Sequence, residues 1–188
     1  STKGNPIWDV SESRIPGECS EAIRIPGGLL LGCSMSTLQT TDLKTWVPQS
    51  EYSVFGLASN GSVLVAATWA RGIRTTAKPP KPLQFSSIQS SSKYRYWNMA
   101  YGAGTFVAAP GSGATFVAVS KDGIHWAERK LSASAISIDK ISYGNGKFVI
   151  SGDYSGFFES TDGLDWTKIQ AERVGSIVRW KNGYVGFN

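Results

Sequence analysis

Carboxylates close to aromatic rings are the most prominent candidates for chemistry in this sequence of 188 residues. Asp122 lies four residues before Trp126 in SKDGIHW, and Asp162 lies four residues before Trp166 in STDGLDW. A carboxylate in this setting could act as an acid or base or bind a metal ion. The frame recurs, however, and recurrence favours a structural role. In a turn, an Asp carboxylate accepts hydrogen bonds from backbone N–H groups, and Gly supplies a positive φ.

The aromatic position of this frame recurs along the whole chain, at intervals of 38 to 41 residues. It is occupied by Trp8, Trp46, Phe85, Trp126 and Trp166. Asp42 completes the frame TTDLKTW, whereas Gly4 and Lys81 replace the aspartate in the other two copies. A period near 40 residues is typical of repeat architectures, in which each repeat is one structural unit.

Each repeat also contains the signals of short strands. Apolar runs meet at Gly-rich turns in AIRIPGGLLLGC, GLASNGSVLVAA, NMAYGAGTFVAA, KISYGNGKFVIS and IVRWKNGYVGFN. A third run precedes the Asp-Gly turn and a fourth follows it, which predicts four antiparallel strands per repeat. Four strands in ~40 residues are one blade of a β-propeller. The sequence therefore predicts an all-β fold, with one five-bladed β-propeller domain over residues 1–188.

The predicted blades cover residues 20–50, 54–90, 97–131 and 138–170, and a closing blade combines 176–188 with 1–12. In the closing blade, residues around Trp8 pair with the C-terminal hairpin, which joins the ends of the chain and removes exposed sheet edges. The interval from Trp166 round to Trp8 is shorter than the other intervals. We therefore expect the closing blade to lack a strand or to have shortened loops.

The repeated frame resembles the Asp-box, or bacterial neuraminidase repeat, in which Ser, Asp, Gly and Trp form a turn between the outer strands of a propeller blade. The resemblance implies that Asp42, Asp122 and Asp162 stabilise turns and that the Trp after each one packs into or between blades. The variant seen here, with adjacent Asp-Gly and the hairpin YGNGKFV, is similar to repeats of bacteriophage tail proteins and of some bacterial propellers. The same blade serves hydrolases, lectins and scaffolds.

A catalytic set does not emerge from the sequence. Sialidase-like glycosidases use three arginines, a tyrosine nucleophile activated by Glu, and an Asp acid/base, and no motif assigns residues to these roles. We therefore expect no enzyme, no catalytic residue and no cofactor. His125 is the only histidine and Cys19 and Cys33 are the only cysteines, so no metal site is expected. The two cysteines could form a cross-strand disulfide or remain buried thiols.

Aromatic and charged residues in the predicted loops are the candidates for binding. They are Trp69, Arg71, Arg74, Lys93, Tyr94, Arg95, Tyr96, Asp153 and Tyr154. Trp97 ends the linker SSSKYRYW, which contains four of them. Aromatic rings stack on sugar faces, and cations pair with carboxylate or phosphate groups, so this mixture suits anionic glycans. The alternative is that the rings fill gaps between blades.

Basic residues are unevenly distributed along the chain. Residues 52–121 contain seven Lys or Arg and no Asp or Glu, whereas the whole chain has a net charge of +5. A sector of this kind attracts anionic partners. No apolar run approaches the ~20 residues that cross a bilayer, so we expect no membrane insertion. Nucleic acid is not an expected partner.

These features together predict a non-enzymatic binding or structural propeller. The expected role is a bacteriophage tail protein or another virion component that attaches to an anionic glycan of the host surface or to a neighbouring virion protein. It would work as part of a larger assembly, located in the virion or otherwise outside the cell. The alternatives are a sialidase-like glycosidase and a soluble lectin that binds anionic glycans.

Overall fold

The computed structural model describes residues 18–69, 72–77, 86–87, 95–132, 134–152, 156–169, 176–180 and 183–187. These ranges contain strands and no helix, which confirms the predicted all-β class, and no helix in them could cross a membrane. Some predictions fall outside the described residues. They concern Gly4, Trp8, Arg71, Lys81, Phe85, Lys93, Tyr94, Asp153, Tyr154 and residues 1–12 of the closing blade.

Four sheets each contain four antiparallel strands in sequence order. The first sheet contains β1 (Cys19–Ile25), β2 (Gly28–Cys33), β3 (Thr37–Thr40) and β4 (Val47–Ser50). The second contains β5 (Val54–Ser59), β6 (Val63–Thr68), β7 (Gly72–Ala77) and β8 (Ser86–Ser87). The third contains β9 (Tyr96–Gly102), β10 (Thr105–Pro110), β11 (Phe116–Ser120) and β12 (Ala127–Lys130). The fourth contains β13 (Lys140–Gly144), β14 (Lys147–Gly152), β15 (Gly156–Ser160) and β16 (Thr167–Ile169).

A fifth unit consists of the hairpin β17 (Ser176–Trp180) and β18 (Gly183–Phe187). The predicted four-stranded unit is therefore present four times, and the fifth unit has two described strands. The sheets do not close into a ring within the described residues. Closure was predicted to need pairing between this hairpin and residues 1–12, which lie outside them.

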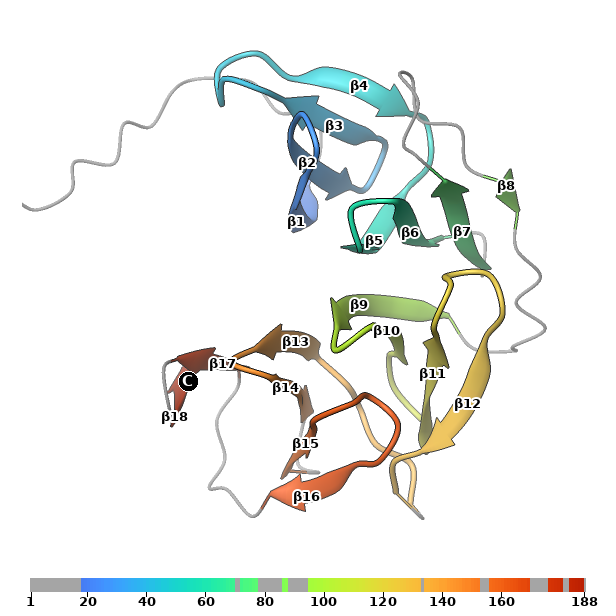
Figure 1. Cartoon of the computed structure of the whole chain (residues 1–188), viewed down its shortest axis with the longest axis vertical. Coiled ribbons are helices and arrows are strands. Elements are labelled where there is room, and N and C mark those ends of the chain that lie inside the picture. The colour runs from blue at the N-terminus through green and yellow to red at the C-terminus, as the bar shows by residue number, and fades with distance from the viewer. Residues whose placement is uncertain are drawn as a thin grey trace, which may run out of the picture.

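The first strands of successive sheets lie side by side and are called the inner strands. β1 contacts β5, β5 contacts β9, β9 contacts β13, and β13 contacts β17. Figure 1 shows the sheets following one another in an arc. The fourth sheet also approaches the first, because Lys140 Nζ of β13 lies 2.7 Å from Glu21 Oε2 of β1. Sheets placed radially around a centre are the architecture of a β-propeller.

Buried apolar side chains fill the space between neighbouring sheets. The middle strands β6, β10 and β14 are buried along most of their length, because both faces of each sheet contact other sheets. One cluster joins Val65 and Ile73 of the second sheet to Phe106 of the third, and another joins Val107 of the third to Phe148 of the fourth. Each such side chain contributes ~1.5–3 kcal/mol of stability when fully buried.

Two glycines allow the inner strands to approach closely. A Cβ on Gly56 of β5 would lie 3.0 Å from Met99 Cγ of β9. A Cβ on Gly102 of β9 would lie 2.2 Å from the ring of Tyr143 in β13. Carbon atoms in contact normally stay ~3.5–4.0 Å apart, so a larger residue at either position would push the sheets apart.

Candidate functional site

The turn between β11 and β12 contains the first of the candidate carboxylates. Asp122 Oδ1 accepts the backbone N–H groups of Ile124 and His125, both at 2.8 Å, and the hydroxyl of Ser120 at 3.0 Å. The oxygen of Ser120 in turn accepts the backbone N–H of Gly123 at 2.8 Å. The Asp122 carboxylate and the Ser120 hydroxyl are thus paired with groups of the turn itself, as a structural role requires.

The fourth sheet has the same turn between β15 and β16, and the first sheet has a close variant between β3 and β4. Asp162 Oδ1 accepts two backbone N–H groups, at 2.8 and 3.1 Å, and Asp42 Oδ1 accepts two at 2.8 Å. The hydroxyls that support them belong to Ser160 and Thr40. In the third and fourth sheets, the indole N–H of Trp126 and of Trp166 donates to the carbonyl of the turn glycine.

These hydrogen bonds keep the three carboxylates ionised. The N–H of Thr45 is the main cause that lowers the pKa of Asp42 to about 2. The side chain of His125 lowers the pKa of Asp122, and the N–H of Leu164 lowers the pKa of Asp162. Carboxyl groups of this kind do not exchange protons near neutral pH. The described residues also contain no group of three or more His, Cys, Asp or Glu that could hold a metal ion.

Another candidate site is a group of three rings, the partly buried Phe55 and the exposed Trp69 and Trp97, which is called the aromatic cluster. The centroid of Phe55 in β5 lies 4.5 Å from that of Trp97 in β9 and 5.6 Å from that of Trp69, which follows β6. The guanidinium of Arg95 lies 4.5 Å from the centroid of Trp69, a cation–π distance. Trp69 is 54% exposed and Trp97 is 36% exposed. The cluster therefore presents aromatic surface to solvent.

Repeat equivalence explains how the rings come together. Phe55 and Trp97 each occupy the second position of an inner strand, the position that Ser20 occupies in β1. Trp69 joins them because its backbone N–H donates to the backbone carbonyl of Ser53, just before β5, at 3.2 Å. Gly111 leaves room for the neighbouring ring, because a Cβ there would lie 2.8 Å from Trp97 Cδ1.

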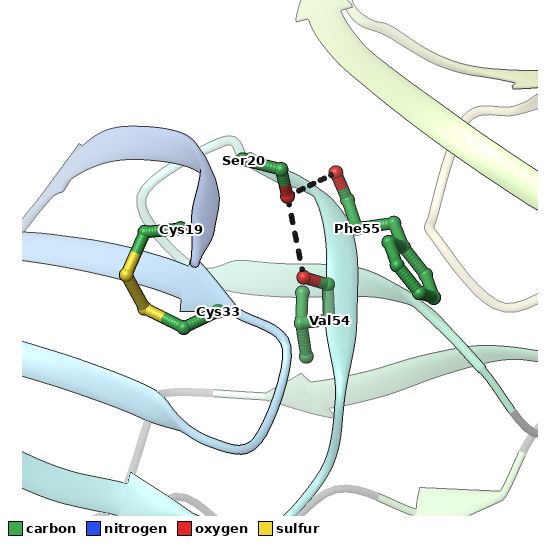
Figure 2. Close-up of a disulfide and its surroundings, with 5 residues drawn as sticks. All are labelled: Cys19, Ser20, Cys33, Val54 and Phe55. Atoms are coloured by element: carbon green, nitrogen blue, oxygen red, sulfur yellow. Dashed lines mark hydrogen bonds between the residues drawn. A yellow bond between two sulfur atoms is a disulfide. The ribbon is translucent and has the colours of Figure 1, made fainter. Parts of the chain in front are cut away.

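A disulfide strengthens the first sheet beside the cluster. Cys19 of β1 and Cys33 of β2 are bonded, so the first of the two alternatives for these cysteines is the one observed. Ser20, the next residue, directs its hydroxyl to the carbonyls of Val54 at 3.4 Å and Phe55 at 3.1 Å. Figure 2 shows this link from the disulfide-bonded sheet to the strand that carries Phe55.

Polar groups flank the cluster on β9, β13 and β1. Asn98, adjacent to Trp97, donates its Nδ2 to the carbonyl of Asp139 at 3.0 Å. The next residue, Lys140, forms the ion pair with Glu21 of β1. The starts of β9, β13 and β1 thus place an amide, an ammonium and a carboxylate around the same end of the sheets. Rings for stacking and polar groups for hydrogen bonding are the components of a carbohydrate site.

The structure brings together part of the predicted binding set. Trp69 and Arg95 meet in the cluster, and Trp97 of the same linker joins them. Phe55 was not among the predicted residues. The signal that could have found it is its repeat equivalence to Trp97. Arg74 makes a separate contact, with its guanidinium 4.2 Å from the ring centroid of Tyr52.

Tyr96, also among the predicted binding residues, lies apart from the cluster. Tyr96 is only 4% exposed and belongs to the core between the second and third sheets. Successive side chains of a strand point to opposite faces, so in β9 Tyr96 points inward where Trp97 points outward.

Comparison with known proteins supports the fold. No protein-family model matches the sequence, and no curated protein matches it. An ancestral GH74 enzyme matches with a TM-score of 0.66 and 17% identity, over 86% of this chain and 25% of its own. YCF48 from Cyanidioschyzon merolae matches with a TM-score of 0.60 and 16% identity, over 87% of this chain and 60% of its own.

The glutaminyl cyclase of Myxococcus xanthus matches with a TM-score of 0.53 and 19% identity, over 73% of this chain and 63% of its own. The chain therefore spans less than two thirds of each of these three proteins. At such identities the comparisons show the fold alone, and that fold is a β-propeller.

The expectation that this chain is not an enzyme is corrected by the same comparison. A GH74 glycoside hydrolase and a glutaminyl cyclase, both enzymes, are among its structural neighbours. The exclusion relied on the lack of a catalytic motif. In a propeller, however, residues of separate blades meet only in space, as Phe55 and Trp97 do here. A missing motif therefore excludes no activity.

Proposed function

We propose that this chain is a glycan-binding propeller, in which the aromatic cluster stacks on sugar rings and Arg95 pairs with an acidic group of the glycan. The observation that carries the proposal is the exposure of Trp69 and Trp97 beside a guanidinium. Large rings contribute most of the energy at many binding sites when a ligand covers them, and Trp and Arg are enriched there.

The orientation of the rings supports a cyclic ligand. The planes of Trp69 and Trp97 meet at 85°, and each makes 46° with the plane of Phe55. The rings therefore form a corner, in which a sugar can contact the face of one indole and the edge of the other. Arg95 adds a planar cation suited to a carboxylate or phosphate on that sugar.

We further propose that the protein works outside the cell, as a component of a bacteriophage tail or another virion that attaches to a host glycan or to a neighbouring virion protein. The disulfide between Cys19 and Cys33 supports this location, because disulfides persist in oxidising surroundings and on virion surfaces. The turns at Asp122 and Asp162 support an Asp-box repeat, the type to which the sequence is similar.

A closed ring of five blades is part of the same proposal. Two contacts support it. β17 of the C-terminal hairpin contacts β13 of the fourth sheet, and Lys140 of β13 forms an ion pair with Glu21 of the first sheet. Deletion of residues 1–10 should then lower the midpoint of thermal unfolding by several degrees, because a strand and Trp8 are lost. An unchanged midpoint in scanning calorimetry would contradict closure by these residues.

The experiment for glycan binding compares two single variants with one control. Trp69→Ala and Trp97→Ala should each weaken retention on an array of acidic bacterial polysaccharides by at least about tenfold, which corresponds to losing roughly 1.4 kcal/mol of binding energy. Ile124→Ala removes an exposed apolar side chain in the turn between β11 and β12 and should bind like the unchanged protein. Equal retention of all four proteins would refute the proposed site.

Two further measurements sharpen this experiment. Arg95→Ser should reduce retention of acidic glycans more than that of neutral glycans and should flatten its dependence on salt. Assay of reducing ends released from the same glycans would detect hydrolysis, which the GH74 likeness makes worth measuring. Retention that is the same for neutral and acidic glycans would contradict the role of Arg95.

A further inference from the structure

A hollow lies away from the aromatic cluster, between the third and fourth sheets at the turn that follows β11. It has a volume of about 310 Å³. The third sheet contributes Lys121, Asp122 and His125 from the turn and Arg129 from β12, and the fourth sheet contributes Leu164. β6 is the second strand of its sheet and β11 is the third strand of its own, so the two strands run in opposite directions and finish at opposite ends of the sheets. This hollow is therefore separate from the cluster at Trp69.

Basic side chains outnumber acidic ones in the hollow. Lys121, His125 and Arg129 line it, and Asp122 is the one carboxylate among its lining residues. That carboxylate is already occupied, because Oδ1 accepts two backbone N–H groups and Oδ2 lies 2.7 Å from His125 Nδ1. Lys121 Nζ donates to Thr105 Oγ1 at 2.5 Å and keeps further protons to donate. Within the described ranges, neither Lys121 nor Arg129 forms an ion pair with a carboxylate.

The repeat shows that the fold does not require these cations. The first sheet has an equivalent hollow of about 300 Å³, in which the three corresponding positions are neutral, as Thr41, Thr45 and Gln49. In the fourth sheet the corresponding residues are Thr161, Asp165 and Ile169. The hollow is therefore a feature of the repeated turn, whereas its three basic groups belong to the third sheet alone among these three.

We infer that this hollow binds a small ligand with a carboxylate or phosphate group, which Lys121 and Arg129 hold by charge-assisted hydrogen bonds. Val119, Ala127 and Leu164 supply apolar contact for the body of the ligand. The volume is at the lower end for ligand sites, which suits a single sugar acid or sugar phosphate. The inference does not depend on glycan binding at the aromatic cluster.

The single histidine of the chain provides a direct measurement. The ring protons of His125 can be followed by NMR at constant pH and ionic strength while glucuronate, glucose 6-phosphate or glucose is added. We expect saturable shifts with one or both acidic sugars and none with glucose. The acidic sugar that gives the tighter saturation identifies the group, carboxylate or phosphate. Equal shifts with glucose, or linear shifts with every added salt, would overturn the site.

Matched variants test the two cations. Lys121→Gln with Arg129→Gln should weaken binding about tenfold or more, since two charge-assisted hydrogen bonds are lost. Lys130→Gln removes a charge from the next position of β12, which points to the opposite face, and should leave the affinity unchanged. Equal weakening by Lys130→Gln would overturn the site in favour of general charge attraction. Arg129→Gln alone gives the same test if the double variant unfolds, because in the described part of the chain the guanidinium of Arg129 has one long hydrogen bond, of 3.5 Å, to the Glu128 carbonyl.

Discussion

The turn of the fourth sheet and the turn of the first sheet share the hydrogen bonds of their Asp, but they differ in the residue after that Asp and in one further hydrogen bond. In both, an Asp accepts two backbone N–H groups and a Ser or Thr hydroxyl supports it. The fourth sheet has Gly163 at φ 79°, and Trp166 donates to its carbonyl at 3.1 Å. The first sheet has Leu43 at φ 61°, and among the described residues Trp46 Nε1 is buried without an acceptor.

This comparison distinguishes the residues that form the turn from the residue that allows neighbouring sheets to pack. The Asp and the hydroxyl form the turn even where Gly is replaced, so glycine is not essential for its hydrogen bonds. Gly163 is needed for packing, because a Cβ there would lie 2.9 Å from Val107 Cγ2 of the preceding sheet. Leu43 is 61% exposed, so it meets no such constraint in the described structure.

The largest effect on stability is expected from replacing a tryptophan that packs against the core and also donates a hydrogen bond. Trp166→Ala should lower the free energy of unfolding by about 3 kcal/mol, as large-to-small changes against a core do. Trp166 packs on the cluster between the third and fourth sheets. Trp46→Ala should cost about 1 kcal/mol less, because its indole makes no hydrogen bond to lose. Urea unfolding measures both, and an equal or larger loss at Trp46 would contradict the comparison.

Removal of the supporting hydroxyl should have the next largest effect. Ser160→Ala leaves the buried N–H of Gly163 without its acceptor and should cost about 2 kcal/mol. Thr40→Val removes the acceptor for the N–H of Leu43, which is only partly buried. Water can replace that bond, so we expect about half the loss. Amide hydrogen exchange of Gly163 and Leu43 provides an independent measurement, with faster exchange expected in each variant.

Substitutions of the residue after the Asp, Gly163 in one turn and Leu43 in the other, should change stability in opposite directions. Gly163→Ala places a Cβ against Val107 at a positive φ and should destabilise by about 1–2 kcal/mol. Leu43→Gly relieves a positive φ at an exposed site and should stabilise by about 0.5 kcal/mol. Thermal unfolding of the two variants measures the signs. Destabilisation by both would show that Leu43 makes a contact that its exposure does not reveal.

The turns and strands were predictable because their determinants are local. The bonds among Ser120, Asp122 and Gly123 lie within four residues, so the sequence frame contains all the partners. The aromatic cluster was only partly predictable. Phe55 and Trp97 are far apart in the chain and meet because β5 packs against β9, and no local pattern encodes that contact.

Long-range packing also limited the prediction of the hollow at Lys121 and of the proposed closing blade. Lys121 was noticed as part of a basic sector, but the hollow needs Leu164 of the next sheet, which depends on how two sheets pack. The number of strands in a closing blade depends on pairing between the two ends of the chain. Such pairing has no local determinant, so the period of the repeat alone did not fix it.

The smallest expected effect concerns His125, whose counterpart in the turn of the fourth sheet is Asp165. His125 Nδ1 lies 2.7 Å from Asp122 Oδ2, and their side chains are 87% and 48% exposed. An exposed pair of this kind contributes little, so His125→Ala should change stability at pH 7 by less than about 0.5 kcal/mol.

The acid side of the stability profile is a finer test of the same pair. The ring of His125 is the main cause that lowers the pKa of Asp122. A carboxylate with a lowered pKa in the folded state stabilises the protein above its unfolded pKa, and this stabilisation is lost as pH falls through the folded pKa. His125→Ala should therefore raise the pKa of Asp122 toward its ordinary value and move the loss of stability to higher pH. NMR titration of the Asp122 carboxyl and urea unfolding below pH 5 measure the two shifts. An unchanged pKa in the variant would show that the backbone N–H groups of Ile124 and His125 and the hydroxyl of Ser120 are enough to keep the carboxylate ionised, as Leu164, Asp165 and Ser160 do at Asp162.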